Sequence, residues 1–360
     1  MYRSQPYYIN QNHHGVGTNQ KRINTMIYYL FPRACIQVNP QNVSIRYPSI
    51  SRPKEKGNQI PIQEIGVSFS LRKYMEEINH VTENLKSWNY QVSHPYSYIV
   101  EVSKIKHVSF IFYELLELYH LLNLSWDKST KMRTLHIGHE ANTSIHFCQY
   151  IRKHEQNKDE NYSVYPVNYT STTMDYYFQE KKHTMDLVIC GASRFSTEYE
   201  NAVELLTQIC LAIISQRRKG TCIIKYGDTF SLLSLDIVAL ISHFYEKTYF
   251  LKPSVCNLST GEKYIVCKNY LYDDLSEKKY TTLKTLFCSS ITKNNLKVER
   301  IIHDTIPLFI SSKLEEINSI FGQSRLEHIQ YLLTHRENWN TEKMKQDGMQ
   351  KSKEWCAKYI

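Results

Sequence analysis

The chain has 360 residues, 42% of them hydrophobic, and a net charge of +9, so it can bury a sizeable core in one large or two modest domains. Its nine cysteines are odd in number and show no Cys-x-x-Cys spacing, which argues against a disulfide framework and a structural zinc site. No apolar run approaches the roughly 18 residues of a membrane span and no secretory signal precedes the chain. We therefore expect a cytoplasmic or otherwise reducing location.

The first 60 residues carry most of the excess charge, with eight Lys and Arg against one acid, and tyrosines lie between the basic residues. Cations bind phosphates and aromatic rings stack on unpaired bases, so this composition is typical of single-stranded RNA binding. The candidate RNA-binding residues are Arg3, Lys21, Arg22, Arg33, Arg52 and Lys54. The alternative is an extension packed on the core. The pair His13-His14 has no further ligand nearby, so we expect no metal site.

Two helices and a strand are expected next. Ser68–Trp88 has apolar residues along one helical face, and Ile105–Leu124 contains the run Phe112-Tyr-Glu-Leu-Leu-Glu117. Arg133–Gly138 reads as the first core strand, followed by a helix that ends at Arg152. The polar residues 156–182 predict a strand at Tyr162–Val167 and otherwise a solvated loop.

The clearest pattern runs from Met185 to Lys268 and alternates apolar strands with apolar helices. Strands are predicted at Met185–Cys190, Thr221–Lys225, Tyr249–Pro253 and Glu262–Lys268, and helices at Glu198–Arg218 and Phe230–Phe244. Lys219-Gly220 would stop the first of these helices. This order indicates half of a doubly wound α/β sheet. In such sheets ligands bind beyond the carboxyl ends of the strands, so Gly191 and Lys225 should line one crevice.

The remaining chain predicts polar segments and then helices, the most regular at Leu314–Leu333. Lys343–Lys358 is rich in lysine and holds Trp355, which predicts a solvated helix face, with a phosphate or partner contact as the alternative. We divide the chain into a basic, aromatic extension over residues 1–65, an α/β domain over 66–275 and a helical extension over 276–360.

The runs Asp186-Leu-Val-Ile-Cys190, Ile223-Ile-Lys225, Lys252-Pro253 and Glu262-Lys-Tyr-Ile-Val266 resemble the second half of the FtsJ-like ribose 2′-O-methyltransferases. Within that family they are closest to the viral and Adrift-type cap-methyltransferase branch. The resemblance covers about half of the chain. It implies a Rossmann-like methyltransferase sheet, mainly parallel with an antiparallel last strand near Glu262–Lys268, helices on both faces, and N- and C-terminal additions.

Active members of this family use a Lys-Asp-Lys-Glu tetrad. By the resemblance, Lys225 is its third member, which assists deprotonation of the ribose hydroxyl, and Glu262 is the fourth. Gly191 stands where the aspartate belongs, and Ile111 or Glu114 stands where the first lysine belongs, depending on the branch used as template. The alternative for Lys225 and Glu262 is an ordinary ion pair at the end of a sheet.

Three other charged residues lie near the positions of the missing tetrad members. Asp186 lies at the wrong end of its strand to replace the aspartate. Lys104 and Lys106 lie one to two turns before the position of the first lysine and would need a shift in register.

The resemblance also implies a site for the methyl donor, S-adenosylmethionine, after the first strand, at Gly138, Glu140, Asn142 and Thr143. The family has proline and two glycines where Asn142, Thr143 and Ser144 stand, because the backbone approaches the cofactor closely there. We therefore expect either no cofactor or S-adenosylmethionine. Asp175 is a candidate contact for its adenine.

These departures favour a degenerate methyltransferase fold that serves as an RNA-binding or assembly subunit of an RNA-processing or capping machinery. The expected partners are RNA, in particular capped mRNA, and the proteins of such a complex, with no membrane. The alternatives are an active cap ribose 2′-O-methyltransferase, completed from Lys104, Lys106 or Asp175, and a protein-binding scaffold that uses the helices after residue 310.

Overall fold

The computed structural model describes residues 28–47, 94–107, 109–127, 130–152, 159–191, 197–292, 298–334 and 341–360. The predicted helix at Ser68–Trp88 lies outside these residues. So do five of the six candidate RNA-binding residues, namely Arg3, Lys21, Arg22, Arg52 and Lys54.

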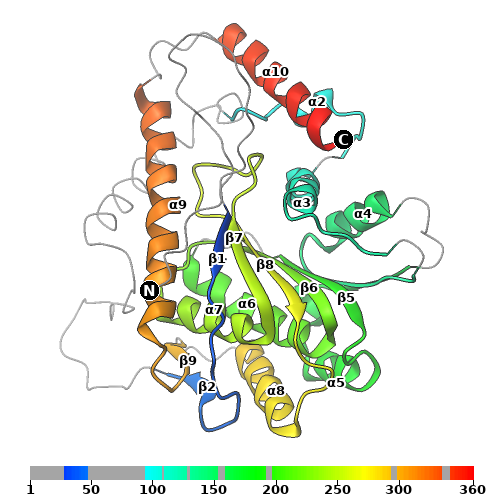
Figure 1. Cartoon of the computed structure of the whole chain (residues 1–360), viewed down its shortest axis with the longest axis vertical. Coiled ribbons are helices and arrows are strands. Elements are labelled where there is room, and N and C mark those ends of the chain that lie inside the picture. The colour runs from blue at the N-terminus through cyan, green and yellow to red at the C-terminus, as the bar shows by residue number, and fades with distance from the viewer. Residues whose placement is uncertain are drawn as a thin grey trace.

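A seven-stranded sheet in the order β1-β7-β8-β6-β5-β3-β4 forms the centre of the molecule (Figure 1). Its strands are β1 (Tyr28–Phe31), β3 (Arg133–Gly138), β4 (Glu160–Val164), β5 (Met185–Gly191), β6 (Gln216–Tyr226), β7 (Tyr245–Leu251) and β8 (Lys263–Tyr270). Strands β4, β3, β5 and β6 pair in parallel, whereas β8 lies between β6 and β7 and runs antiparallel to both. The predicted α/β fold, mainly parallel with an antiparallel last strand, is confirmed.

Helices cover both faces of the sheet because successive side chains of each strand point to opposite faces. Val188 and Cys190 of β5 belong to the apolar cluster with the central helices, whereas Leu187 and Ile189 belong to the second cluster on the other face. The first face is packed by α5 (Ser171–Glu180), α6 (Glu198–Ser215), α7 (Leu232–Phe244), α8 (Glu277–Ile291) and α9 (Leu308–Thr334). The second is packed by α3 (Phe110–Leu121), α4 (Ala141–Ile151) and α10 (Thr341–Tyr359), beside the short α2 (Ile99–Val102).

Helix α6 ends earlier than its apolar period predicts. It stops at Ser215, and residues 216–220, expected as helix and stop, are the first part of β6. The Gln216 side chain donates to the Met185 carbonyl over 2.7 Å and accepts from the Tyr245 hydroxyl over 3.0 Å, which fixes the chain beside β5. Lys219, at φ +64°, lies in the bulge where the pairing with β5 shifts.

The segment after α4 contains more structure than the predicted loop. β4 is followed by a single 3₁₀ turn, η2 (Pro166–Asn168), and by α5, whose N-cap Thr170 accepts a hydrogen bond from the Thr173 amide. Asp175 lies on α5 and forms an ion pair with Lys284 of α8. Its contact with a cofactor adenine stays a prediction.

Segments from both ends of the chain pack on the core. β1 adds an antiparallel edge strand to β7, and β2 (Val43–Arg46) pairs with β9 (Arg300–Ile302). Trp355 of α10 is 4% exposed and its indole donates to Glu117 of α3 over 2.9 Å, so the expectation of a merely solvated face is wrong for this side of the helix. Within the described part of the chain, no helix has the length and apolar character needed to cross a membrane.

Candidate functional site

Lys225, the next-to-last residue of β6, meets α3 at the carboxyl edge of the sheet. Its Nζ lies 2.9 Å from Glu114 Oε2 and 3.4 Å from Glu262 Oε2. The Tyr264 hydroxyl donates to the same oxygen of Glu114 over 2.5 Å. These four residues, Glu114, Lys225, Glu262 and Tyr264, form what we call the Lys225 cluster.

The charges of this cluster fix its protonation. Burial disfavours the ammonium form of Lys225, but the carboxylates of Glu114 and Glu262 outweigh this effect and raise the pKa of the lysine well above its ordinary value. Burial, and then the negative charge of Glu114, raises the pKa of Tyr264. At neutral pH the lysine is therefore a cation and the tyrosine a hydroxyl donor, so neither group can accept a proton.

The resemblance places the first lysine of the tetrad at Ile111 or Glu114 of α3. Glu114, and not Ile111, faces Lys225, and its side chain is 4% exposed. Lys106 is exposed and donates to the Glu101 carbonyl before α3 begins, and Lys104 is exposed as well. A shift in register does not occur, because α3 begins at Phe110 with Ser109 as its N-cap, later than the predicted Ile105. α3 thus presents a carboxylate to Lys225.

Gly191 ends β5 beside Lys225 and is the residue that stands in the aspartate position. No described atom lies within 4 Å of the position that a Cβ would take here. Its carbonyl accepts a hydrogen bond from the Gln208 side chain over 3.1 Å. Asp186 lies at the other end of the strand, as its sequence position predicts, and pairs there with Arg217 over 2.7 Å. The resemblance predicts a carboxylate at this position, and the sequence has a glycine there.

The predicted donor loop is occupied by contacts within the protein. Gly138 has φ +113°, and a Cβ there would lie 2.0 Å from the carbonyl oxygen of Gly191, so the close approach that this glycine permits is to the neighbouring strand. Glu140 accepts from Thr143 over 2.9 Å, and Asn142 accepts from Tyr165 over 2.6 Å. The donor site at this loop stays a prediction.

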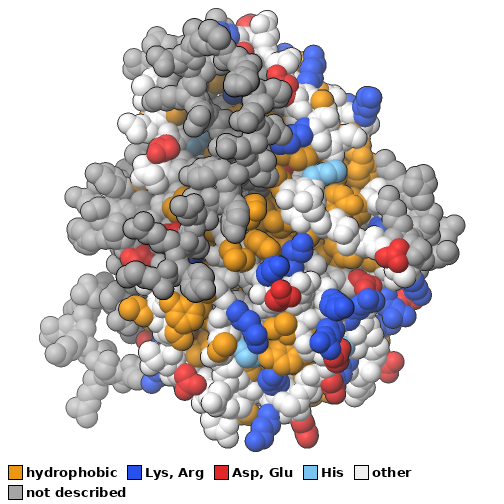
Figure 2. Space-filling model, in the orientation of Figure 1, with side chains coloured by type: hydrophobic (Ala, Val, Ile, Leu, Met, Phe, Trp, Pro, Cys, Tyr) orange, Lys and Arg blue, Asp and Glu red, His pale blue; other side chains and the backbone are white. Residues whose placement is uncertain are grey.

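Arg33 is the one candidate RNA-binding residue within the described ranges. It is exposed, and its Nε donates to the His243 carbonyl at the end of α7 over 3.3 Å. Figure 2 shows Lys and Arg side chains interspersed with Asp and Glu over the lower part of the visible face. Arg217 and Arg218, for example, pair with Asp186 and Asp273. Such exposed pairs contribute little to stability and partly cancel the field that would attract a polyanion.

Sequence reasoning gave no role to Tyr264 of the Lys225 cluster, or to Lys252, Lys263 and Arg325, which line a small pocket together with Glu262. Lys263 opens β8 and is only 2% exposed, although lysine is rarely buried without a carboxylate partner. The alternation of β8 predicts that Lys263 shares a face with Ile265. The sequence does not show that α9 covers this face and brings Arg325 to it.

No protein-family model and no curated protein matches this chain. Among solved structures, it is similar to phosphoethanolamine N-methyltransferase 1 of Haemonchus contortus, bound to phosphoethanolamine and S-adenosylhomocysteine, with 10% identity and a TM-score of 0.28. That alignment covers 60% of this chain and 53% of the other, so the chain spans about half the length of this neighbour. It is also similar to aspartate aminotransferase of Thermus thermophilus with maleate, at 8% identity and a TM-score of 0.22, over 73% and 67% of the two chains. Likenesses this weak carry no argument about function, so the strand order described above remains the basis for the fold.

Proposed function

We propose that this chain is a non-catalytic relative of the FtsJ-like RNA ribose 2′-O-methyltransferases, which binds RNA as a subunit of an RNA-processing or capping assembly. The observation that carries the proposal is the contact between Glu114 and Lys225, which are 2.9 Å apart. Glu114 is one of the two residues that the resemblance aligns with the first lysine of the active family's tetrad.

A lysine that assists removal of a hydroxyl proton works best when its pKa lies near the working pH. A neighbouring cation and burial lower a lysine pKa, whereas a carboxylate raises it. Lys225 has two carboxylates within 4 Å and a raised pKa, so its proton stays on the nitrogen. Each lost acid, base or positioning group typically costs on the order of a hundredfold in rate. The absence of an aspartate at Gly191 and the altered loop at Asn142 add to that loss.

Lys225 retains a structural role in this account. Its ammonium group neutralises Glu114, a side chain that is 4% exposed on α3, and so joins that helix to the carboxyl edge of the sheet. An uncompensated carboxylate at such a depth would destabilise the fold by several kcal/mol, on the order of 3 to 5. The positive charge of the lysine thus serves packing instead of proton transfer.

RNA is the proposed partner because the net charge of +9 is concentrated in a tyrosine-rich N-terminal segment. Cations and stacking rings together suit an unpaired polyanion with planar bases. A capped 5′ end is the substrate class of the family that the chain resembles, and we extend the proposal to it on that ground.

The test is binding of a short capped RNA by the full chain, measured at 50 and 200 mM salt with fluorescence anisotropy. Phosphate contacts release counterions, so five or six of them predict a loss of affinity of roughly a thousandfold over this range. The matched variants are Arg3→Ala with Lys21→Ala, which should reduce the slope by about 2, and Lys247→Ala on β7, which should leave it unchanged. Affinity that does not change with salt would contradict the proposal and favour the protein-binding scaffold.

A further inference from the structure

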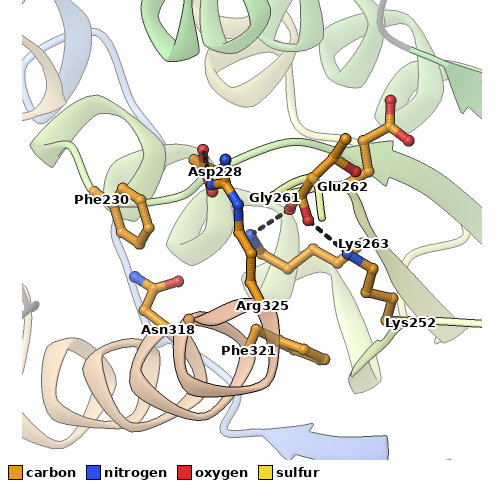
Figure 3. Close-up of a pocket in the computed structure, with 11 residues that line it drawn as sticks. Asp228, Phe230, Lys252, Gly261, Glu262, Lys263, Asn318, Phe321 and Arg325 are labelled. Atoms are coloured by element: carbon orange, nitrogen blue, oxygen red, sulfur yellow. Dashed lines mark hydrogen bonds and ion pairs between the residues drawn. The ribbon is translucent and has the colours of Figure 1, made fainter. Parts of the chain in front are cut away.

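A small pocket lies next to the Lys225 cluster, between the start of β8 and the middle of α9 (Figure 3). Its lining includes Lys252, Lys263 and Arg325 as well as the carboxylates of Asp228 and Glu262. The space open to the centre of a water-sized sphere is about 10 Å³, which is room for about one water molecule or one ligand oxygen.

The two lysines of the pocket are held by main-chain carbonyls. Lys263 donates to the Gly227 carbonyl over 2.5 Å and lies 3.4 Å from the Gly261 carbonyl. Lys252 donates to the Thr260 carbonyl over 2.5 Å. Among the described residues, no carboxylate lies within 4.0 Å of either ammonium group. Burial therefore lowers the pKa of each lysine to about 8.

The carboxylates that line the pocket are engaged by other cations. Glu262 lies 3.4 Å from Lys225, and Asp228 lies 3.7 Å from Arg325. Arg325 also donates to the Ser259 carbonyl over 2.7 Å, which holds the guanidinium on the α9 side. The same small space is thus lined by three cations: Lys252, which follows β7, Lys263 of β8 and Arg325 of α9 (Figure 3).

We propose that this pocket binds a phosphate ester, with one anionic oxygen placed between Lys252, Lys263 and Arg325. Ammonium and guanidinium donors make strong, short hydrogen bonds to phosphate oxygens, and arginine matches their geometry best. Only one oxygen fits inside, so the rest of the ligand remains at the mouth. There the carboxylates of Asp228 and Glu262, with side chains 31% and 41% exposed, disfavour a second negative charge. A phosphodiester, which carries a single charge, fits this arrangement better than a dianionic phosphate.

This proposal does not depend on RNA being the partner, because a small phosphate ester and an RNA backbone would both use the same donors of the pocket. Binding should be sensitive to pH, since an anion favours the charged lysines. Lys252 faces a set of titratable and charged groups that comprises Cys256, Glu262, Lys263, Arg325, His94 and His328. Lys263 faces Asp228, Glu198 and Arg325. As the pH rises through about 8, both lysines lose their protons and affinity falls.

The experiment is calorimetric titration of the full chain with two probes, inorganic phosphate and a dinucleoside monophosphate, at pH 7 and 9.5. We expect binding of at least one probe at pH 7, a loss of about tenfold or more at pH 9.5, and a similar loss in Lys252→Met at pH 7. Lys247→Met, at a side chain 50% exposed on β7, is the matched control and should bind like the wild type.

Each outcome decides the question. Tighter binding of the dinucleoside monophosphate identifies nucleic acid as the source of the ester, and equal binding identifies a small phosphate compound. No binding of either probe at millimolar concentration, or wild-type affinity in Lys252→Met, overturns the site. Lys263→Met tests the most buried donor, and Arg325→Gln replaces it if that variant does not fold. A chain that binds inorganic phosphate but not RNA would keep this site and remove the proposed function.

Discussion

Glu114 shows how one side chain changes what a neighbouring group can do. Its carboxylate lies 2.9 Å from the Lys225 ammonium and accepts from Tyr264, whereas Glu262 reaches the same lysine from a side chain that is 41% exposed. Water screens the second pair more than the first, so the two carboxylates have unequal weight.

Replacing Glu114 by Gln should therefore destabilise the fold by about 2 kcal/mol, because a buried cation loses its nearest counter-charge. Replacing Glu262 by Gln, the matched control, should cost below about 1 kcal/mol. Urea unfolding followed by circular dichroism measures both. Equal losses would mean that the buried contact does not dominate the cluster.

Lys263 gives a second prediction at this scale, in the pH dependence of stability. Its pKa is about 8 in the fold and 10.5 when unfolded, so between these values the unfolded chain binds more protons and stability rises with pH. The penalty for burying the charge is fully present below pH 8. Compared with Lys263→Met, the wild type should gain up to about 2 kcal/mol between pH 8 and 9.5. The cysteines and tyrosines titrate in both proteins, so their effect cancels in the difference between the two free energies of unfolding. A constant difference would show that Lys263 has an ordinary pKa.

At the scale of elements, the ends of β3 and β5 meet glycine to glycine. Gly138 has φ +113° and its absent Cβ would lie 2.0 Å from the Gly191 carbonyl oxygen, whereas a Cβ on Gly191 meets no described atom within 4 Å. Gly138→Ala should therefore cost at least about 3 kcal/mol, from backbone strain and overlap together. Gly191→Ala should change stability by less than about 1 kcal/mol. Thermal unfolding of the pair tests this, and a tolerated Gly138→Ala would mean that the two strands can separate at this edge.

The elements also show what local patterns can predict. β3, which ends at Gly138, has the predicted bounds. α7 begins two residues later than predicted, because it is a long and mostly apolar run with a clear helical pattern. The end of α6 was not predictable from its period, since Gln216 joins β5 through its side chain. Residues 171–180 read as polar loop because α5 buries only Met174 and Tyr177.

The candidate site, like the fold, is predictable from local patterns only in part. The parallel pairing of β5 and β6 predicts that Gly191 and Lys225 share one edge, and the pairing of β6 with β8 brings Glu262 to it. The first lysine of the family could be aligned to either Ile111 or Glu114, because the residue of α3 that faces Lys225 depends on how this helix lies on the sheet. Lys263 and Arg325 meet through the packing of α9 against the core, a contact between distant segments that no local pattern records.

At the scale of the whole molecule, helices on both faces leave the carboxyl edge of the parallel strands as the place where Lys225 and the neighbouring pocket lie (Figure 1). The two ends of the chain reinforce this core: β1 extends the sheet, and α9 and α10 pack on opposite faces of it. The division into residues 1–65, 66–275 and 276–360 stays a prediction. The distribution of charge, basic at the amino terminus and paired at the Lys225 cluster, is what favours binding over catalysis.

Methyl transfer itself tests the central claim most directly. The full chain is incubated with capped RNA and S-adenosylmethionine that carries a radioactive methyl group, beside an active cap ribose methyltransferase as positive control and the Lys225→Ala variant. We predict that the wild type transfers no more label to the RNA than Lys225→Ala does, because the lysine remains protonated between Glu114 and Glu262. Transfer by the wild type that disappears in Lys225→Ala would contradict this account and identify the chain as an active enzyme.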